Sequence, residues 1–355
     1  SYPRTLSESN TTHKSVPLMM SHLGSKHFND SIYCVRSIID AFSEAGFTTA
    51  WLSNQRRNGA LIDFFGSRAD TVRFITDDGA DHYDMELCPL LRQVLDSGAP
   101  RVFAVLHTYG SHFNYRGRYP ADCAVYGSGG NYEASAENRD ELIDEYDNTI
   151  LYTDRLLDSV ITIASSCGRR AAVVYASDHG EDIFDDSRGR FLHASPTPTF
   201  RQLHVPMLIW MSDAFRHDEP EMYAAAKAAA SDEVSSSRSV FHTLVSMAGI
   251  TTPYYDASAA LTDSRYKAPE RLYLNDYNEG VALEDAGLRR QDFDELAAHG
   301  MYQAETRPAN SLATRQMPLV RGVQTATRSM SANMQTAYTS AMNASDASVN
   351  SAGDI

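Results

Sequence analysis

The sequence is poor in cysteine, in long apolar runs and in positive charge. Its 355 residues include four cysteines, which are far apart and form no Cys-x-x-Cys pair, so that a disulfide framework and a thiolate zinc site are both excluded. No stretch reaches the roughly 18 consecutive apolar residues that a membrane-spanning helix needs. The 31 basic residues are outnumbered by 46 acidic ones, and the formal net charge is −15. Such a surface repels polyanions, which argues against nucleic acid as a partner.

The overall composition is that of a globular protein. Hydrophobic residues make up 43% and charged residues 22% of the chain, which excludes a fibrous or wholly disordered protein. After about Met301 the composition changes to Ala, Ser, Thr, Asn and Met. We therefore predict a folded domain over residues 1–302 and, over residues 303–355, either a low-complexity tail or a peripheral helix whose Met330, Met334, Tyr338 and Met342 share one face.

Short apolar runs alternate with helical stretches along the first 302 residues. The runs have the length and the β-branched or aromatic content of buried strands, and two segments have helical spacing of apolar residues. This alternation predicts an α/β fold with a mostly parallel central sheet and helices on both faces. The expected strands are 50–52, 102–106, 171–175 and 205–210, with 272–274 as an edge strand, and the expected helices are 38–45 and 141–164.

Polar residues follow three of the expected strands at their carboxyl ends. They are Ser53-Asn-Gln55, His107-Thr-Tyr-Gly-Ser-His112 and Ser177-Asp-His-Gly-Glu181. Because open α/β sheets bind their ligands at this edge, we expect these side chains to form one site.

The pair Asp178-His179 is a candidate metal site. A carboxylate and a neutral imidazole suit a zinc-type cation, although Asp178 could instead cap the next helix while His179 is solvated. Two further histidines strengthen the metal interpretation, because His193 is only a loop away and His112 follows another strand. We interpret His107 as structural and His112 as functional.

A candidate nucleophile lies near the N-terminus, in Thr11-Thr12-His-Lys-Ser15-Val-Pro17. Hydroxyl residues before an apolar helical run are typical of an N-cap, so that either Thr11 or Thr12 could only cap the helix. The same position favours an alkoxide and the phosphate that it attacks, because the helix dipole is positive there and backbone N–H groups are free. The metal residues downstream favour the nucleophile interpretation for Thr12.

Taken together, these motifs resemble the bacterial phosphoethanolamine transferases, which include the lipid A modifying and colistin-resistance enzymes of the sulfatase and alkaline phosphatase superfamily. The resemblance covers most of residues 5–301 and says nothing of the tail. It is carried by Thr12-His-Lys-Ser-Val-Pro-Leu, Trp51-Leu-Ser-Asn-Gln55, His107-Thr-Tyr-Gly-Ser-His112, Tyr146-Asp-Asn-Thr-Ile-Leu-Tyr-Thr-Asp154, Ser177-Asp-His-Gly-Glu181, Leu192-His193 and His204-Val-Pro-Met-Leu-Ile-Trp210.

The resemblance implies a role for each matching residue. Thr12 would be the nucleophile that is transiently modified by phosphoethanolamine, and would bind Zn²⁺ together with Asp178 and His179. By the same resemblance, His112 and His193 would hold the phosphoryl group or a second metal and act as acid or base. Glu181 would be a carboxylate near the same site. Asn54 and Gln55 would contact the ethanolamine phosphate.

The family's first zinc ligand is a glutamate in a Gly-Glu-Ser/Thr motif a few tens of residues before the nucleophile. That motif is absent from the eleven residues before Thr12, and Glu8 is too close to take its place. The resemblance thus leads us to expect a glutamate ligand and a membrane domain upstream of Ser1. It also implies a phosphatidylethanolamine donor, an envelope glycolipid acceptor and a location on the periplasmic face of the bacterial inner membrane.

Two other classes of function remain open from the sequence, a hydrolase of the same fold and a binding domain. A phosphodiesterase of the same fold would use water in place of the acceptor. A sulfatase would need Cys or Ser followed by x-Pro-x-Arg, and in Ser15-Val-Pro17-Leu-Met19 a methionine replaces the arginine. The other alternative is an envelope-binding domain that has lost its metal. Only the missing glutamate supports this alternative.

Overall fold

A three-stranded parallel sheet contains the strands expected around residues 50–52 and 102–106. The computed structural model describes residues 1–302 except 58, 128–129 and 131, so that the predicted tail over 303–355 lies outside the described residues. Strand β2 (Thr48–Ser53) is central, with β3 (Thr71–Phe74) and β4 (Val102–His107) parallel to it on either side. The sequence did not single out β3.

The strands expected at 171–175 and 205–210 form a second sheet. β5 (Ala172–Ala176) and β8 (Met207–Met211) pair with each other in antiparallel orientation. Between them lie only short elements, β6 (Asp182–Ile183), β7 (Phe191–Leu192) and α7 (Phe200–Leu203), in place of the long crossover that a parallel pair needs. The α/β class is therefore confirmed, whereas within these two sheets the parallel pairing extends only over β2, β3 and β4.

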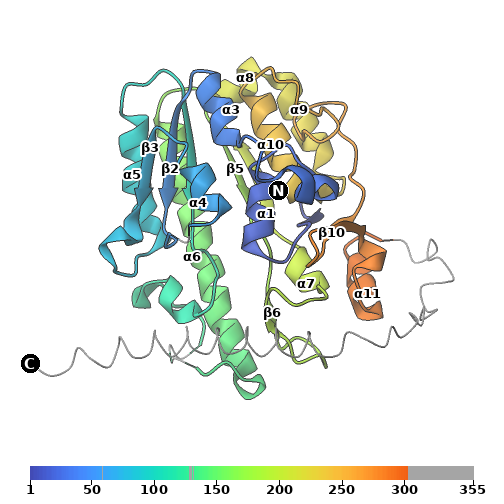
Figure 1. Cartoon of the computed structure of the whole chain (residues 1–355). Coiled ribbons are helices and arrows are strands. Elements are labelled where there is room, and N and C mark those ends of the chain that lie inside the picture. The colour runs from blue at the N-terminus through green and yellow to red at the C-terminus, as the bar shows by residue number, and fades with distance from the viewer. Residues whose placement is uncertain (58, 128–129, 131, 303–355) are drawn as a thin grey trace, which may run out of the picture. The chain divides into compact units, whose positions relative to one another are not determined.

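Helices cover both faces of the parallel sheet (Figure 1). On one face, Ala50 and Leu52 of β2 pack against α5 (Leu87–Leu95) and α6 (Arg139–Ser166). On the other, Trp51 packs against α1 (Thr12–Met19), α3 (Ile38–Glu44), α4 (Leu61–Gly66) and α10 (Ser236–Met247). Successive side chains of a strand point to opposite faces, so that this run of three apolar residues is buried on both sides.

Trp51 packs directly on the backbone of α4. The indole is fully buried, and a Cβ added to Gly66 would lie 2.6–2.8 Å from its ring atoms. Only glycine allows this close approach, which fixes α4 against the sheet next to the carboxyl end of β2.

The expected strand 272–274 is present, but it is not an edge of the central sheet. β10 (Leu272–Leu274) pairs antiparallel with β11 (Gly280–Ala282), the next strand along the chain. The short turn between them makes this local pairing available first, which is why the prediction of an edge strand was wrong.

Two further short sheets join β1 (Thr5–Leu6) in parallel to β9 (Val234–Ser235) and β6 antiparallel to β7. No helix of the described residues combines the length and the apolar composition needed to cross a bilayer. The remaining helices are α2 (Phe28–Ser31), α8 (Asp213–Asp218), α9 (Pro220–Ala229) and α11 (Arg290–Ala298), and the 3-10 turns are η1 (Ser25–His27), η2 (Ile75–Asp78), η3 (Asp84–Glu86), η4 (Tyr115–Arg118), η5 (Ala121–Cys123), η6 (Ala136–Asn138) and η7 (Leu283–Asp285).

Candidate active site

Thr12 is the first residue of α1 and faces the loop after β5. Its Oγ1 lies 3.0 Å from Nε2 of His179, and its hydroxyl also hydrogen-bonds to the carboxylate of Asp178. Thr11 occupies the N-cap position, and no side-chain hydrogen bond caps the helix. Neither threonine side chain therefore caps the helix. The hydroxyl of Thr12 is instead directed at the two candidate metal ligands.

Asp178 and His179 lie close enough to share a cation. Nε2 of His179 is 3.4 Å from Oδ2 of Asp178, and its Nδ1 donates to the carbonyl oxygen of Gly180. That donation leaves the lone pair of Nε2 free to face Thr12 and Asp178. Burial raises the pKa of Asp178, but the neighbouring His179 and the hydroxyl of Thr12 outweigh it, so that the pKa lies below its ordinary value.

These three donors fit zinc by their chemistry. An imidazole nitrogen, a carboxylate oxygen and a hydroxyl oxygen converge, and zinc accepts nitrogen and oxygen ligands while leaving a position open for substrate. Within the described part of the chain no three His, Cys, Asp or Glu side chains form a metal cluster, so that Thr12 is needed as the third donor. Glu8 is not a fourth, because its carboxylate accepts from Oγ of Ser235 at 2.7 Å and from the amide of Ser25 at 3.4 Å.

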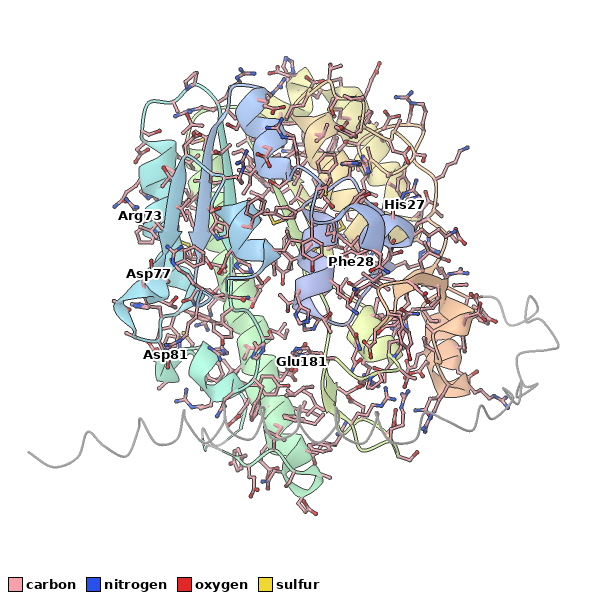
Figure 2. All side chains as sticks on the ribbon, viewed as in Figure 1. His27, Phe28, Arg73, Asp77, Asp81 and Glu181 are labelled. Carbon is pink, nitrogen blue, oxygen red and sulfur yellow. The ribbon has the colours of Figure 1, made fainter. Side chains whose placement is uncertain are left out.

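His193 lies beside this triad. Its ring centroid is 4.1 Å from that of His179, and its Nδ1 donates to Oε1 of Glu181 at 3.0 Å. Glu181 is buried near α6 (Figure 2), and its Oε2 accepts from the hydroxyl of Tyr115. Glu181 therefore orients His193 and leaves Nε2 available.

Sequence reasoning missed Tyr115. Its hydroxyl is fully buried, and burial together with Glu181 raises its pKa well above the ordinary value, which keeps it a donor. The only sequence signal was its position three residues after His112, on the same loop.

His112 is a second histidine next to His193. The two ring centroids are 5.6 Å apart, and Nδ1 of His112 donates to the carbonyl of Phe113 at 2.5 Å. Burial lowers the pKa of His112, which favours the neutral imidazole. Thr12, His112, Asp178, His179 and Glu181 all line one cavity of about 1350 Å³.

Asn54 and Gln55 support the loop that carries His112. The amide of Asn54 donates to Oδ1 of the buried Asp84 at 2.8 Å, and Asp84 in turn accepts from the backbone N–H groups of Tyr109 and Gly110 at 2.8 Å. Nε2 of Gln55 donates to the carbonyl of Thr108 at 2.9 Å, and Gln55 also lines the cavity. Contact of either residue with ethanolamine phosphate stays a prediction.

Two other sequence interpretations concern residues close to the site. Nε2 of His107 is buried, desolvation lowers the pKa of this histidine to about 4, and its Nδ1 is 3.1 Å from Oγ of Ser53. Such a neutral, packed imidazole is consistent with the structural role. Ser15 is fully buried and donates to the carbonyl of Thr11 at 2.6 Å, so that its hydroxyl is not presented as a sulfatase-type nucleophile.

Gly180 lets the metal loop pack against α7. A Cβ added there would lie 2.1 Å from the carbonyl oxygen of Arg201, so that Gly180→Ala must push the Asp178-His179 segment away from α7. We expect a loss of about 2 kcal/mol in the free energy of unfolding, measured with urea. Gly24→Ala is the control, because a Cβ added at Gly24 would meet no atom within 4 Å. Equal stability of the two variants would contradict this account of Gly180.

Comparison with known proteins now decides the family. A family model described as Sulfatase matches residues 1–250. The chain belongs to the sulfatase family. Within it, the chain is homologous to enzymes named phosphoethanolamine transferases. It is 30% identical to EptA of Salmonella typhimurium, over 72% of this chain and 48% of EptA, and 24% identical to EptC of Escherichia coli, over 72% of this chain and 45% of EptC.

Solved structures of this sulfatase-family group share the fold. The zinc complex of the C-terminal periplasmic domain of E. coli EptC has a TM-score of 0.72 at 22% identity and covers 82% of this chain and 83% of that one. The soluble domain of lipooligosaccharide phosphoethanolamine transferase A from Neisseria meningitidis has a TM-score of 0.67 at 25% identity, over 76% and 82%. The chain spans about half the length of the curated relatives it matches.

Proposed function

We propose that this chain transfers phosphoethanolamine from a phosphatidylethanolamine-type donor to a cell-envelope glycolipid, such as lipid A or a core sugar, through a phosphorylated Thr12. The observation that carries the proposal is the placement of the Thr12 hydroxyl 3.0 Å from Nε2 of His179, with the carboxylate of Asp178 as its second hydrogen-bond partner. The named activity of the relatives supports the choice of phosphoethanolamine. The zinc complex and periplasmic origin of the EptC domain support zinc and the periplasmic face of the inner membrane for this chain.

In the first step the Oγ1 of Thr12 attacks the phosphorus of the donor. The new Thr12–phosphorus bond forms as the bond from phosphorus to the glycerol oxygen breaks, and diacylglycerol leaves. The hydroxyl proton passes to solvent, because the carboxylate of Asp178 and Nε2 of His179, which face the hydroxyl, would keep their lone pairs for zinc. Diacylglycerol needs a proton on its departing oxygen, and His193, which is paired with Glu181, is the nearby group that can supply it from Nε2.

In the second step a hydroxyl or phosphate oxygen of the acceptor attacks the same phosphorus and releases Thr12. The histidine that gave its proton in the first step now accepts one from the acceptor. Glu181 stabilises the cationic form of His193 before the first step and again after the second, because its Oε1 is 3.0 Å from Nδ1. Each step thus needs only a proton relay and charge neutralisation around the phosphoryl oxygens.

Zinc would be held by Thr12, Asp178 and His179. When bound, it would lower the pKa of the threonine hydroxyl and offset the negative charge of the phosphoryl group. The three side chains already face one another in the described structure, which supports one tight site.

The test compares transfer with hydrolysis. The chain is incubated with zinc and phosphatidylethanolamine in detergent micelles, with and without a lipid A-type glycolipid, and both lipid products are followed by mass spectrometry. We expect the glycolipid to gain one phosphoethanolamine unit and diacylglycerol release to rise when the acceptor is present. Release of free phosphoethanolamine at the same rate without acceptor would instead identify a phosphodiesterase, and absence of zinc binding and turnover would favour a metal-free envelope-binding domain.

A further inference from the structure

His193 lies between two residues with left-handed backbone. Leu192 has φ = 67° and Ala194 has φ = 61°, a region that residues with a Cβ adopt at a cost. Neither position is a glycine, so that the turn is not favoured by its own sequence. Contacts from elsewhere must hold it, and with it the imidazole of His193.

The side chain of Gln202 supplies one set of these contacts. Gln202 lies on α7 and is fully buried. Its Nε2 is 2.9 Å from the carbonyl oxygen of Leu192 and 2.7 Å from Oγ of Ser195. The amide therefore bonds to the chain on both sides of His193.

Gln202 also holds the metal loop. Its backbone carbonyl accepts from the N–H of Gly180 at 2.9 Å, directly after His179. Its Nε2 is a further 2.9 Å from Oδ2 of Asp182, a buried carboxylate that Thr199 binds as well. One residue thus fixes the loop of His193 relative to that of Asp178 and His179.

Asn10, two residues before Thr12, links the nucleophile segment to Gln202 and to the turn around His193. Its Nδ2 donates to Oε1 of Gln202 at 2.7 Å and to the carbonyl of Ser195 at 3.0 Å. Its own carbonyl accepts from the N–H of Ala194 at 3.1 Å. The hydroxyl of Tyr273 donates to Oδ1 of Asn10 at 2.9 Å, so that every polar atom of this buried side chain is engaged.

We propose that Asn10 and Gln202 are positioning residues: as a pair of buried amides they clamp the strained turn around His193 to the nucleophile segment and the metal loop. The hydrogen bonds end at Leu192 and Ala194, which flank His193 directly, and at Ser195, the next residue along the chain. Loss of the clamp lets the turn relax towards ordinary backbone angles and moves the imidazole away from Thr12. The catalytic consequence rests on the proposed function, whereas the clamp itself is a property of the fold.

The first experiment measures the clamp without relying on activity. Gln202→Met keeps the length of the side chain and removes its donor and acceptor. Hydrogen exchange followed by mass spectrometry on the whole chain should show backbone amides of peptides covering residues 190–196 exchanging at least about tenfold faster. The matched control is Asn148→Leu, another buried amide, which binds the backbone of Val125 and Tyr126 and should leave residues 190–196 unchanged.

The second experiment asks whether the clamp serves His193. An alkyl ester of phosphoethanolamine needs a proton on its leaving oxygen, whereas a p-nitrophenyl ester does not. Gln202→Met should lower kcat/KM for the alkyl ester by on the order of 10- to 100-fold and for the aryl ester much less. An equal loss on both esters would overturn the positioning role, because it would indicate only general damage.

If Gln202→Met does not fold, a milder variant provides the same test. Tyr273→Phe removes only the hydroxyl that anchors Asn10 and should change exchange and ester selectivity in the same direction by a smaller factor. Wild-type exchange over residues 190–196 in the folded variants would refute the clamp. If the wild type turns over neither ester, the proposed function fails, but the exchange measurement still decides the clamp.

Discussion

Thr12→Ala is expected to abolish the covalent intermediate and to lower donor turnover by on the order of a thousandfold or more. The Oγ1 of Thr12 is the hydroxyl that the fold places 3.0 Å from His179 and in a hydrogen bond with Asp178. Alanine removes both the attacking atom and one of three candidate zinc donors. Intact mass spectrometry after incubation with phosphatidylethanolamine should show added phosphoethanolamine on the wild type and none on the variant.

Two controls make the result specific to Thr12. Thr12→Ser keeps a hydroxyl at the start of α1 and should retain the mass shift. Ser15→Ala removes a neighbouring hydroxyl that is buried and bonded to the carbonyl of Thr11, and should be modified like the wild type. A mass shift of wild-type size in Thr12→Ala would reject Thr12 as the nucleophile.

Glu145→Gln is expected to remove a large pH dependence of stability. Glu145 lies on α6, is 3% exposed, and neither carboxylate oxygen has a hydrogen-bond partner among the described residues. Burial raises its pKa from an ordinary 4.5 to about 7, although Arg116 partly opposes the shift. The folded state therefore retains a proton that the unfolded chain loses between these two values.

The sign follows from that difference in bound protons. Stability contributed by the protonated carboxyl is fully present below about pH 4.5 and is lost as the pH rises to about 7. The loss approaches about 3 kcal/mol, since each pKa unit is worth about 1.4 kcal/mol. Urea unfolding at pH 5 and pH 8 should show the wild type losing more stability than Glu145→Gln by most of this amount.

An exposed carboxylate on the same helix provides the control for Glu145. Asp154→Asn should follow the wild-type pH dependence, because its side chain lies on the exposed side of α6. Identical pH dependence of the wild type and Glu145→Gln would show that the carboxyl of Glu145 is ionised and solvated at neutral pH in the folded state.

The sequence predicts the parts of this molecule that follow from local pattern. The run from Val102 to Leu106 is apolar and β-branched, and it becomes β4; Ile38 to Glu44 becomes α3, and Gly46 after it adopts φ = 80°. Residues at the strand ends could be predicted to meet because parallel strands end at one edge. The antiparallel pairing of β8 with β5 could not be predicted, because it depends on the path by which residues 177–206 lead the chain back to β5.

The candidate site divides in the same way. Asp178 and His179 are adjacent in the chain, but Thr12 and His179 are 167 positions apart, and only the family resemblance predicted that they meet. Asn10 and Gln202 carry no local signal, and Tyr115 has only its position three residues after His112, since a tyrosine or an amide also occurs on the surface. Their roles come from burial next to other loops, which is a property of the tertiary structure.

Asp84 has a consequence for protein engineering. Its carboxylate joins Asn54, at the end of β2, to the amides of Tyr109 and Gly110, at the start of the segment that carries His112. Suppose that a chimaera receives this segment from a homologue. The segment would keep its geometry only if the homologue's residues equivalent to Asn54 and Asp84 were transferred with it. Substrate preference should therefore be exchanged between family members as a three-part cassette drawn from separate stretches of the chain.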